Sequence, residues 1–255
     1  MGKVYLVGAG PGAPDLLTLR AARLLDRADI LLHDALVHPD TIALAAKAEK
    51  IAVGKRCGRR STAQRFINKR LVDAARKHAV VVRLKGGDPM LFGRVHEEIC
   101  ALEEAGIDYE VVPGVTAALA ASAAIGVSLT RRGMARSVTF ATPRVGTEEE
   151  ESDWAPAVVA ADTSVLYMGV GQSPEIARCL LERGMSPATP VRVVENASLP
   201  TMREFRLSLS ELHRAAESGV AGPAVIMLGQ VFDASSCNIA DAASAEAPLT
   251  HLRRA

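Results

Sequence analysis

Short apolar runs alternate with helical patterns along almost the whole chain, and this alternation restricts the fold more than any other feature. The run AVVVRL at residues 79–84 is nearly continuous, as expected for a strand that is buried on both faces. Residues 15–28 carry apolar side chains at helical spacing. Residues 61–77 begin with Ser61 and Gln64, which have the spacing of a capping box. Strands that alternate with helices in this way predict α/β layers.

The same patterns predict further elements and two domains. Glycine and polar residues interrupt the regular elements at 126–133, so we expect α/β domains at residues 1–126 and 127–233. An Ala- and Ser-rich tail, 234–255, is expected to be disordered, and the acidic run 148–153 to be a solvated loop. Further strands are expected at 3–7, 29–32, 109–112, 136–141, 163–168, 190–195, 202–209 and 223–229, and further helices near 93–105, 115–129, 173–184 and 210–218.

Composition argues against several classes of partner. The net charge is +1 and aromatic residues make up 4% of the chain, so nucleic-acid and membrane partners are not expected. The least polar stretch, 115–129, is short and mostly alanine, which is typical of a buried helix. The four cysteines form no C-x-x-C pair, which argues against a zinc site or disulfide framework and fits a reducing cytoplasm, and the N-terminal residues predict no leader.

The loop GAGPGAPDLLTL at 8–19 allows two interpretations. Gly8, Gly10 and Ala13 match a dinucleotide-binding pattern, and the acidic Asp34 follows at about the right distance. Pro11 and Pro14, however, remove two backbone N–H donors from the segment that would hold a pyrophosphate. A tight turn that packs a helix on a strand explains the glycines equally well.

Two further strand ends carry residues suited to a ligand. Gly86, Gly87 and Asp88 follow the strand at 79–84, at the edge where open α/β sheets bind ligands. The Asp88 carboxylate suits hydroxyl groups such as those of a ribose, although an ordinary turn would use the same three residues. Thr116 and Ala117 likewise stand either at a ligand site or at a helix start.

Arginines gather near these loops. The clusters GKRCGRR at 54–60 and TRRGMAR at 130–136, together with Arg94, suit an anionic ligand, because arginine binds carboxylates through two parallel hydrogen bonds. The alternative is an ordinary solvated surface. His33 and Asp34 are adjacent on a strand, so they are not expected to act as a pair.

Taken together, these segments resemble the tetrapyrrole methylase family over residues 3–232. The matching pieces include VYLVGAGPGAPDLLTL, HDALV, VVRLKGGDPMLFGR, GVSLTRR, VLYMG and GPAVIMLGQV. GKRCGRRSTAQRFINKRL is similar to the subfamily that methylates uroporphyrinogen III. The resemblance implies two α/β domains with a cofactor and substrate cleft between them, a cytoplasmic homodimer and S-adenosyl-L-methionine as methyl donor, with S-adenosyl-L-homocysteine as product. The implied reaction methylates uroporphyrinogen III at C2 and C7 to precorrin-2, in siroheme and cobalamin biosynthesis.

The resemblance also assigns site residues and implies no metal. Asp34 matches the family's proposed proton acceptor and Lys55 its proposed proton donor. Arg94, Glu97 and Arg132 match residues implicated in substrate binding or proton abstraction. The implied cofactor contacts are Pro11, Gly86, Gly87, Asp88, Leu91, Thr116, Ala117, Met168 and Ala197.

Several positions depart from the family pattern, mostly toward the acceptor side. They are Ala13, Val95, His96, Ala124, Arg131, Pro143 and Arg144. A divergent methylase with another acceptor is therefore one alternative. The others are a non-catalytic protein that keeps the cofactor site, and an oxidoreductase that holds a dinucleotide at 8–13.

Overall fold

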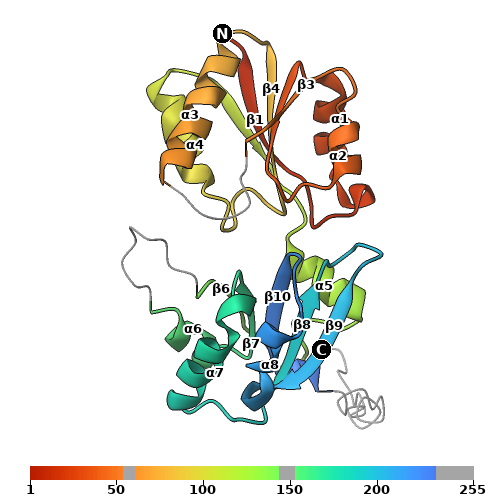
Figure 1. Ribbon diagram of the computed structural model, residues 1–255, viewed down its shortest axis with the longest axis vertical. Helices are drawn as coiled ribbons and strands as arrows, with labels where there is room; N and C mark the ends of the chain where they lie inside the picture. The colour runs from red at the N-terminus through yellow and green to blue at the C-terminus, as the bar shows by residue number, and fades with distance from the viewer. Residues whose placement is uncertain (54–60, 144–152, 234–255) are drawn as a thin grey trace, which may run out of the picture.

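The first half of the chain forms a parallel sheet with helices on both faces. The computed structural model describes residues 1–53, 61–143 and 153–233 (Figure 1). Its first sheet has the order β3-β2-β4-β1-β5, and every neighbouring pair is parallel. The strands are β1 (Lys3–Gly8), β2 (Ile30–His33), β3 (Glu49–Ala52), β4 (Val80–Lys85) and β5 (Tyr109–Val112).

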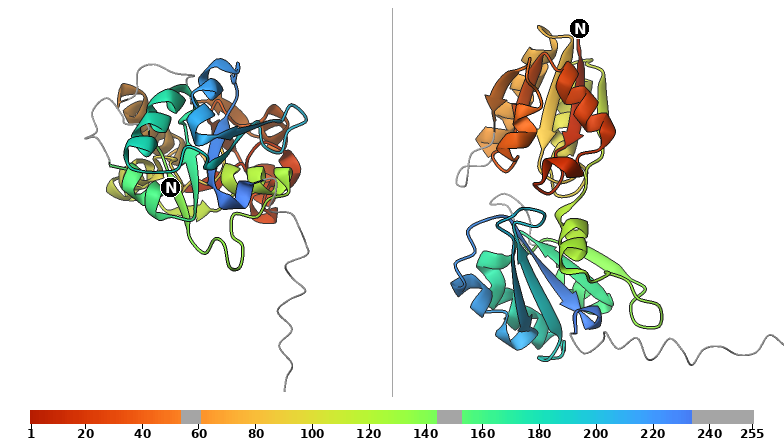
Figure 2. Two further views of the ribbon diagram at one scale, coloured as in Figure 1. Left: turned by 90° about the horizontal axis from the view of Figure 1, so that it is seen from below. Right: turned by 90° about the vertical axis from the view of Figure 1, so that its right-hand side faces the viewer.

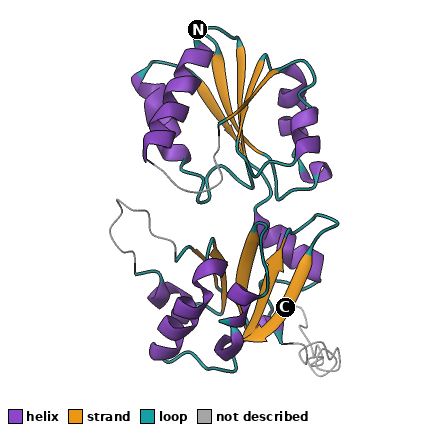
Figure 3. Ribbon diagram, viewed as in Figure 1, coloured by secondary structure: helices purple, strands orange, loops and turns teal. Residues whose placement is uncertain are grey.

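Helices cover both faces of this sheet because its central strands are apolar on both sides. Residues of α1 (Leu19–Arg27) and α2 (Pro39–Ala43) pack on one face around Val82 and Leu84. Residues of α3 (Ser61–Ala75) and α4 (Val95–Glu104) pack on the other face around Val81. Figure 3 shows these helices on the two sides of the strands. Alternate residues of β4 therefore serve two different cores.

The second half forms a mixed sheet with the order β6-β7-β10-β8-β9. Only β6 and β7 pair in parallel among these strands; the other neighbouring pairs are antiparallel. The strands are β6 (Val138–Ala141), β7 (Thr163–Tyr167), β8 (Pro190–Glu195), β9 (Arg203–Ser208) and β10 (Ala224–Gly229). The helices are α5 (Ala117–Ile125), α6 (Ala155–Ala160), α7 (Ser173–Glu182) and α8 (Arg214–Glu217).

The two sheets lie one above the other along the long axis of the molecule, as Figure 1 and the right-hand view of Figure 2 show. Helix α5 packs on the second sheet, where Ala118 and Ala121 share a core with Val165 and Met227. The chain thus passes from the first sheet to the second between β5 and α5, whereas the expected boundary at 126–127 follows that helix.

The α/β class predicted from the alternation is confirmed, and two strands, 109–112 and 190–195, have the predicted bounds. The helix expected over 15–28 is wrong at its start. A short 3-10 turn (Pro14–Leu16) comes first, and α1 begins at Leu19 because the Thr18 hydroxyl accepts a hydrogen bond from Ala21 N at 3.1 Å.

Other elements differ in extent or were missed. The helix expected over 210–218 is two short pieces, Leu209–Glu211 and Arg214–Glu217. Strand β3 was missed because its sequence, EKIA, is a half-charged edge strand with no apolar run. The short helices α2 and α6 were missed as well. The tail 234–255, Lys55, Arg144 and nearly all of the acidic run 148–153 lie outside the described residues.

Among the residues that the structure describes, no helix has the length and apolar character needed to cross a bilayer.

Candidate active site

Three glycines bring the ends of β1, β4 and β5 into backbone contact. A Cβ atom on Gly114 would lie 2.3 Å from the Gly87 carbonyl oxygen and 2.9 Å from the Cα of Gly8. A Cβ on Gly8 would in turn lie 2.6 Å from Gly114 Cα. Side chains are therefore excluded here, and the carboxyl ends of the three strands present bare peptide groups.

The opening loop is tied to this junction by its backbone. Gly10 N donates to Gly87 O at 3.2 Å, and Gly87 N donates to Gly10 O at 2.7 Å. Both residues have a positive φ, 72° for Gly10 and 68° for Gly87. The loop thus forms a turn that locks β1 to β4, while the next helix, α1, begins only at Leu19. A dinucleotide loop would instead lead directly into a helix N-terminus.

Asp88 holds two loops together. Its Oδ1 accepts a hydrogen bond from Met90 N at 2.8 Å, and its Oδ2 accepts one from Gly114 N at 2.9 Å. The side chain is partly exposed, so each oxygen keeps a lone pair for a further donor. Leu91, also partly exposed, closes the same turn by donating its N–H to Asp88 O at 3.3 Å.

The segment that follows Leu91 is held in an unusual backbone conformation. Phe92 and Arg94 both have φ of 53°, a region that costs non-glycine residues free energy. Arg94 Nε and Nη2 donate to the two carboxylate oxygens of Glu97 at 2.6 and 2.9 Å. These two predicted substrate-side residues therefore pair with each other, and both are more than 40% exposed.

Loops of the second sheet meet this region. Tyr167, at the end of β7, shares a 2.6 Å hydrogen bond with the Thr116 hydroxyl and accepts one from Ala118 N at 3.2 Å. Its ring lies 5.1 Å from the ring of Phe92, which belongs to the first sheet's loops. Burial raises the pKa of the Tyr167 hydroxyl, which the Thr116 and Ala118 contacts partly offset. Met168, the next residue, has φ of 57° and is 45% exposed.

A second contact joins the opening loop to the end of β8. Ala13 N donates to the Ser198 hydroxyl at 3.1 Å, and a Cβ on Gly12 would lie 2.9 Å from a side-chain carbon of Leu199. Ala197 itself is buried. Pro11, partly exposed, stands in the same loop. Loops from both sheets therefore gather at one place, and they carry every predicted cofactor residue.

Asp34 lies after β2 and is 29% exposed. Its Oδ1 accepts a hydrogen bond from Arg83 Nη2 at 2.5 Å. Arg83 was not predicted as a site residue, and its only signal in the sequence is a charge inside an otherwise apolar strand. Tyr167 was not predicted either, because its position in the sequence is that of an ordinary strand residue.

The fold of a single chain does not bring Arg132 to the candidate site. It lies in the exposed turn closed by Arg131 N donating to Ala135 O at 2.9 Å. In the right-hand view of Figure 2, the segment between α5 and β6 projects from the second sheet away from the first. Among the departures, Ala124 is exposed on α5, Val95 is buried at the start of α4, and Pro143 is buried.

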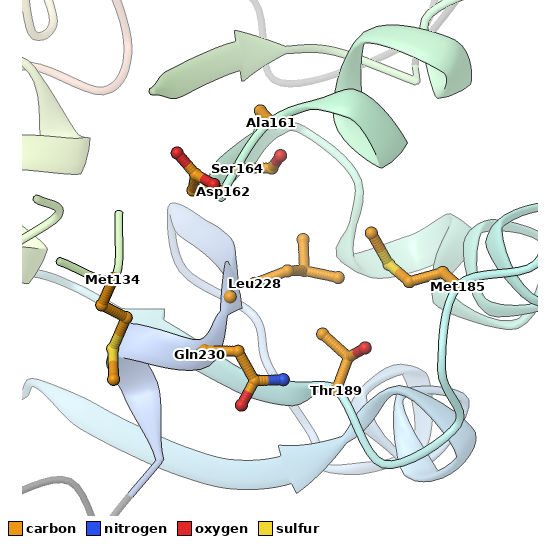
Figure 4. Close-up of a pocket in the computed structure, with 9 residues that line it drawn as sticks. Met134, Ala161, Asp162, Ser164, Met185, Thr189, Leu228 and Gln230 are labelled. Carbon is orange, nitrogen blue, oxygen red and sulfur yellow. The ribbon is translucent and has the colours of Figure 1, made fainter. Parts of the chain in front are cut away.

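One cavity lies elsewhere, at the opposite end of β7. It has a volume of about 220 Å³ and is lined by nine residues, including Asp162, Thr189 and Gln230 (Figure 4). Asp162 Oδ2 already accepts hydrogen bonds from the backbone N–H groups of Arg136 and Ser137. None of the nine lining residues is a predicted site residue.

Comparisons with known proteins agree over nearly the whole chain. Residues 3–213 match the family described as Tetrapyrrole (Corrin/Porphyrin) Methylases. The uroporphyrinogen-III C-methyltransferase of Pseudomonas aeruginosa is 45% identical over 231 residues, which cover 90% of this chain and 94% of that protein. The siroheme synthase of a Psychrobacter species is 42% identical over 91% of this chain, but this chain spans only 48% of its length.

A solved structure is similar in fold as well. The uroporphyrin-III C-methyl transferase of Thermus thermophilus, in complex with S-adenyl homocysteine, aligns with a TM-score of 0.78 and 43% identity over 90% of this chain and 98% of that one. The family match favours the methylase interpretation of the sequence over the dinucleotide one. The chain belongs to the tetrapyrrole methylase family.

Proposed function

We propose that this chain is an S-adenosyl-L-methionine-dependent C-methyltransferase that converts uroporphyrinogen III to precorrin-2 by methylation at C2 and C7. The observation that supports it most directly is the gathering of loops from both sheets around the junction of Gly8, Gly87 and Gly114. The names of the relatives from Pseudomonas and Thermus support the same reaction.

The residues at the junction fit the methyl donor. Bare peptide groups at Gly86 and Gly87 allow close approach, and Asp88 has lone pairs left for hydroxyl groups. Leu91 and the exposed side chain of Met168 supply apolar contacts. Pro11, Thr116, Ala117 and Ala197 complete the proposed donor site. The relative from Thermus has been solved with S-adenyl homocysteine, the demethylated product of this donor.

When bound, the donor supplies a methyl group that its sulfonium makes electrophilic. The protein's own task is then to align the acceptor carbon and to exclude water. Methyl transfer to a pyrrole carbon leaves a positive charge on the ring system, and a base must remove a proton from elsewhere on that system to neutralise it. Asp34, whose carboxylate accepts a hydrogen bond from Arg83, is proposed as the proton acceptor. Lys55 is the proposed proton donor.

The acceptor carries eight carboxylates, which suit arginine partners. Arg94 and Arg132 are exposed and are proposed to bind them, with Glu97 setting the direction of the Arg94 guanidinium. Because Arg132 lies on a segment that projects from the second sheet, its role would come from another copy or from a movement of that segment. A cytoplasmic homodimer that serves siroheme or cobalamin synthesis, with no nucleic-acid or membrane partner, completes the proposal.

A change of acceptor is the second candidate. Val95 and His96 stand where the resemblance leads us to expect two glycines, directly after Arg94, and Val95, the first residue of α4, is buried in a core of the first sheet. These bulkier residues alter the start of α4 next to the proposed acceptor site.

Calorimetry combined with a product assay separates these candidates. We expect S-adenosyl-L-methionine to bind and NADH not to bind. Uroporphyrinogen III is then supplied anaerobically beside other reduced tetrapyrroles as competing acceptors. Preferred methylation of a different ring would refute the proposed acceptor and support the second candidate. Binding of NADH alone would refute both.

A further inference from the structure

A line of charged side chains runs beneath the candidate site and is mostly closed to solvent. Arg83 and Lys85 lie on β4 and Glu98 on α4, with side-chain exposures of 2%, 4% and 0%. Asp34 forms the outer end of the line and is 29% exposed. The line therefore connects the interior of the first α/β layer to the proposed proton acceptor.

Glu98 is the point at which these contacts meet. Its Oε1 accepts hydrogen bonds from Arg83 Nε at 3.0 Å and from Lys85 Nζ at 2.9 Å. The amide of Gln64, on α3, approaches the same oxygen at 3.5 Å. The other oxygen, Oε2, is buried and has no hydrogen-bond partner in the described part of the chain. A single oxygen of Glu98 thus serves every donor.

Arg83 links Glu98 to Asp34, because its guanidinium donates hydrogen bonds to both carboxylates. Its guanidinium is a rigid planar fork, so a contact at Nε sets the direction of the Nη2 donor. Nη2 is the group that binds Asp34 Oδ1, and Nη1 donates to Leu84 O at 3.3 Å. Parallel pairing of β2 with β4 sets Leu32 opposite Arg83, which brings the residues after β2 within reach. Each of the three guanidinium nitrogens therefore donates to an acceptor.

The charges along the line balance. Two cations, Arg83 and Lys85, face two carboxylates, Asp34 and Glu98. Burial and the neighbouring Arg83 charge lower the pKa of the Lys85 ammonium, while Glu98 and Asp34 oppose this effect. Removal of one partner from such a buried pair leaves an uncompensated charge, whereas joint replacement of both partners is tolerated far better.

We propose that Glu98 is a positioning residue that acts through Arg83 to hold the Asp34 carboxylate toward the acceptor. This inference rests on the proposed function, in which Asp34 takes up the proton. Glu98 itself is closed to solvent, so the proposal gives it no direct contact with substrate or donor. Its Oε1 matters because it is the acceptor for Arg83 Nε.

Two double variants test the role of the Glu98 Oε1 acceptor. Lys85→Met/Glu98→Gln and Lys85→Met/Glu98→Met both remove one positive and one negative charge, so the Arg83–Asp34 pair stays balanced in each. Glutamine keeps an acceptor oxygen for Arg83 Nε and can place its amide where the unpartnered Oε2 lies. Methionine removes the acceptor at similar volume. Glu204→Gln is the matched control, since Glu204 pairs with the buried Arg192 in the second sheet.

We expect loss of the acceptor oxygen to lower kcat and to leave donor affinity unchanged. The glutamine double variant and Glu204→Gln should keep kcat within about threefold of wild type, whereas the methionine double variant should lose about tenfold or more, with an unchanged Kd for S-adenosyl-L-methionine. Equal kcat in the two double variants would overturn the proposal. A loss of kcat that comes with an equal loss of donor affinity would also overturn it.

Crystal structures of the two double variants test the inference independently of the reaction. The Arg83–Asp34 contact should persist in the glutamine variant and be lost or redirected in the methionine variant; an unchanged contact in both would overturn it. If wild-type protein methylates no uroporphyrinogen III, the proposed acceptor fails, and these structures still decide whether Glu98 positions Asp34.

Discussion

Asp88 Oδ2 accepts a hydrogen bond from the backbone N–H of Gly114, 2.9 Å away and 26 residues later in the chain. This contact joins the loop after β4 to the end of β5. The same carboxylate holds Met90 N through its other oxygen. A residue proposed for cofactor binding thus also shapes the loops that would surround the cofactor.

Asp88→Ala should therefore weaken the donor site in two ways. It removes a proposed ligand contact and leaves two backbone N–H groups without their acceptor, at a cost of about 1–3 kcal/mol in stability. We expect calorimetry to show at least a tenfold loss of S-adenosyl-L-methionine affinity, about 1.4 kcal/mol. Asp88→Asn keeps one acceptor oxygen and should lose less. An unchanged Kd for Asp88→Ala would contradict the assigned donor site.

Gly114→Ala should destabilise the junction of the three strand ends. The added Cβ would lie 2.3 Å from the Gly87 carbonyl oxygen, and a backbone neighbour cannot rotate away. We expect a loss of about 1–3 kcal/mol in the free energy of unfolding, measured by urea denaturation. Gly171→Ala is the control, because its Cβ would meet nothing within 4 Å. Equal stability of the two variants would show that the close approach is absent.

Tyr167→Phe tests the contact between the two sheets' loops. The change removes the hydroxyl that bonds the Thr116 side chain and Ala118 N but keeps the ring beside Phe92. We expect a loss of about 1 kcal/mol in stability and a severalfold weaker binding of S-adenosyl-L-methionine. Tyr109→Phe removes an exposed hydroxyl contact to Glu103 and should change neither quantity. An equal Kd for S-adenosyl-L-methionine in the two variants would contradict the assignment of Thr116 to the donor site.

Glu195 should make stability depend on acid pH. Burial opposes ionisation, but hydrogen bonds from Gly222 N, Arg203 and Ala221 N prevail and lower its pKa below the ordinary 4.5. A carboxyl whose pKa is lower when folded stabilises the protein above its unfolded pKa and loses that contribution as the pH falls through the folded value. We expect Glu195→Gln to be less stable than wild type at pH 7, with the gap narrowing below about pH 4.5. A constant gap across that range would contradict this account.

Much of the fold could be predicted from the sequence because the spacing of apolar residues indicates which faces of a strand or helix are buried. The strand at 79–84 is apolar on successive residues, and β4 is indeed covered by helices on both faces. Strand β3 could not be found in this way because one edge strand with charged residues buries little apolar surface. Short helices such as α2 carry less than two turns of pattern, too few for a period of 3.6 to show.

The candidate site divides in the same manner. Gly86, Gly87 and Asp88 follow a recognisable strand, so their place at a sheet edge could be predicted. The partners of Asp34 could not, because Arg83 is 49 residues away and its contact depends on which strands become neighbours. Glu98 carries no sequence signal either, since an acidic residue in the first turn of a helix is ordinary.

The most direct test of the proposed function is a count of methyl groups transferred. Purified protein is incubated anaerobically with S-adenosyl-L-methionine and freshly generated uroporphyrinogen III, and the oxidised products are weighed by mass spectrometry. We predict a product that has gained two methyl groups, with Asp34→Asn giving little or none. Donor binding with no methylated product from this acceptor would contradict it.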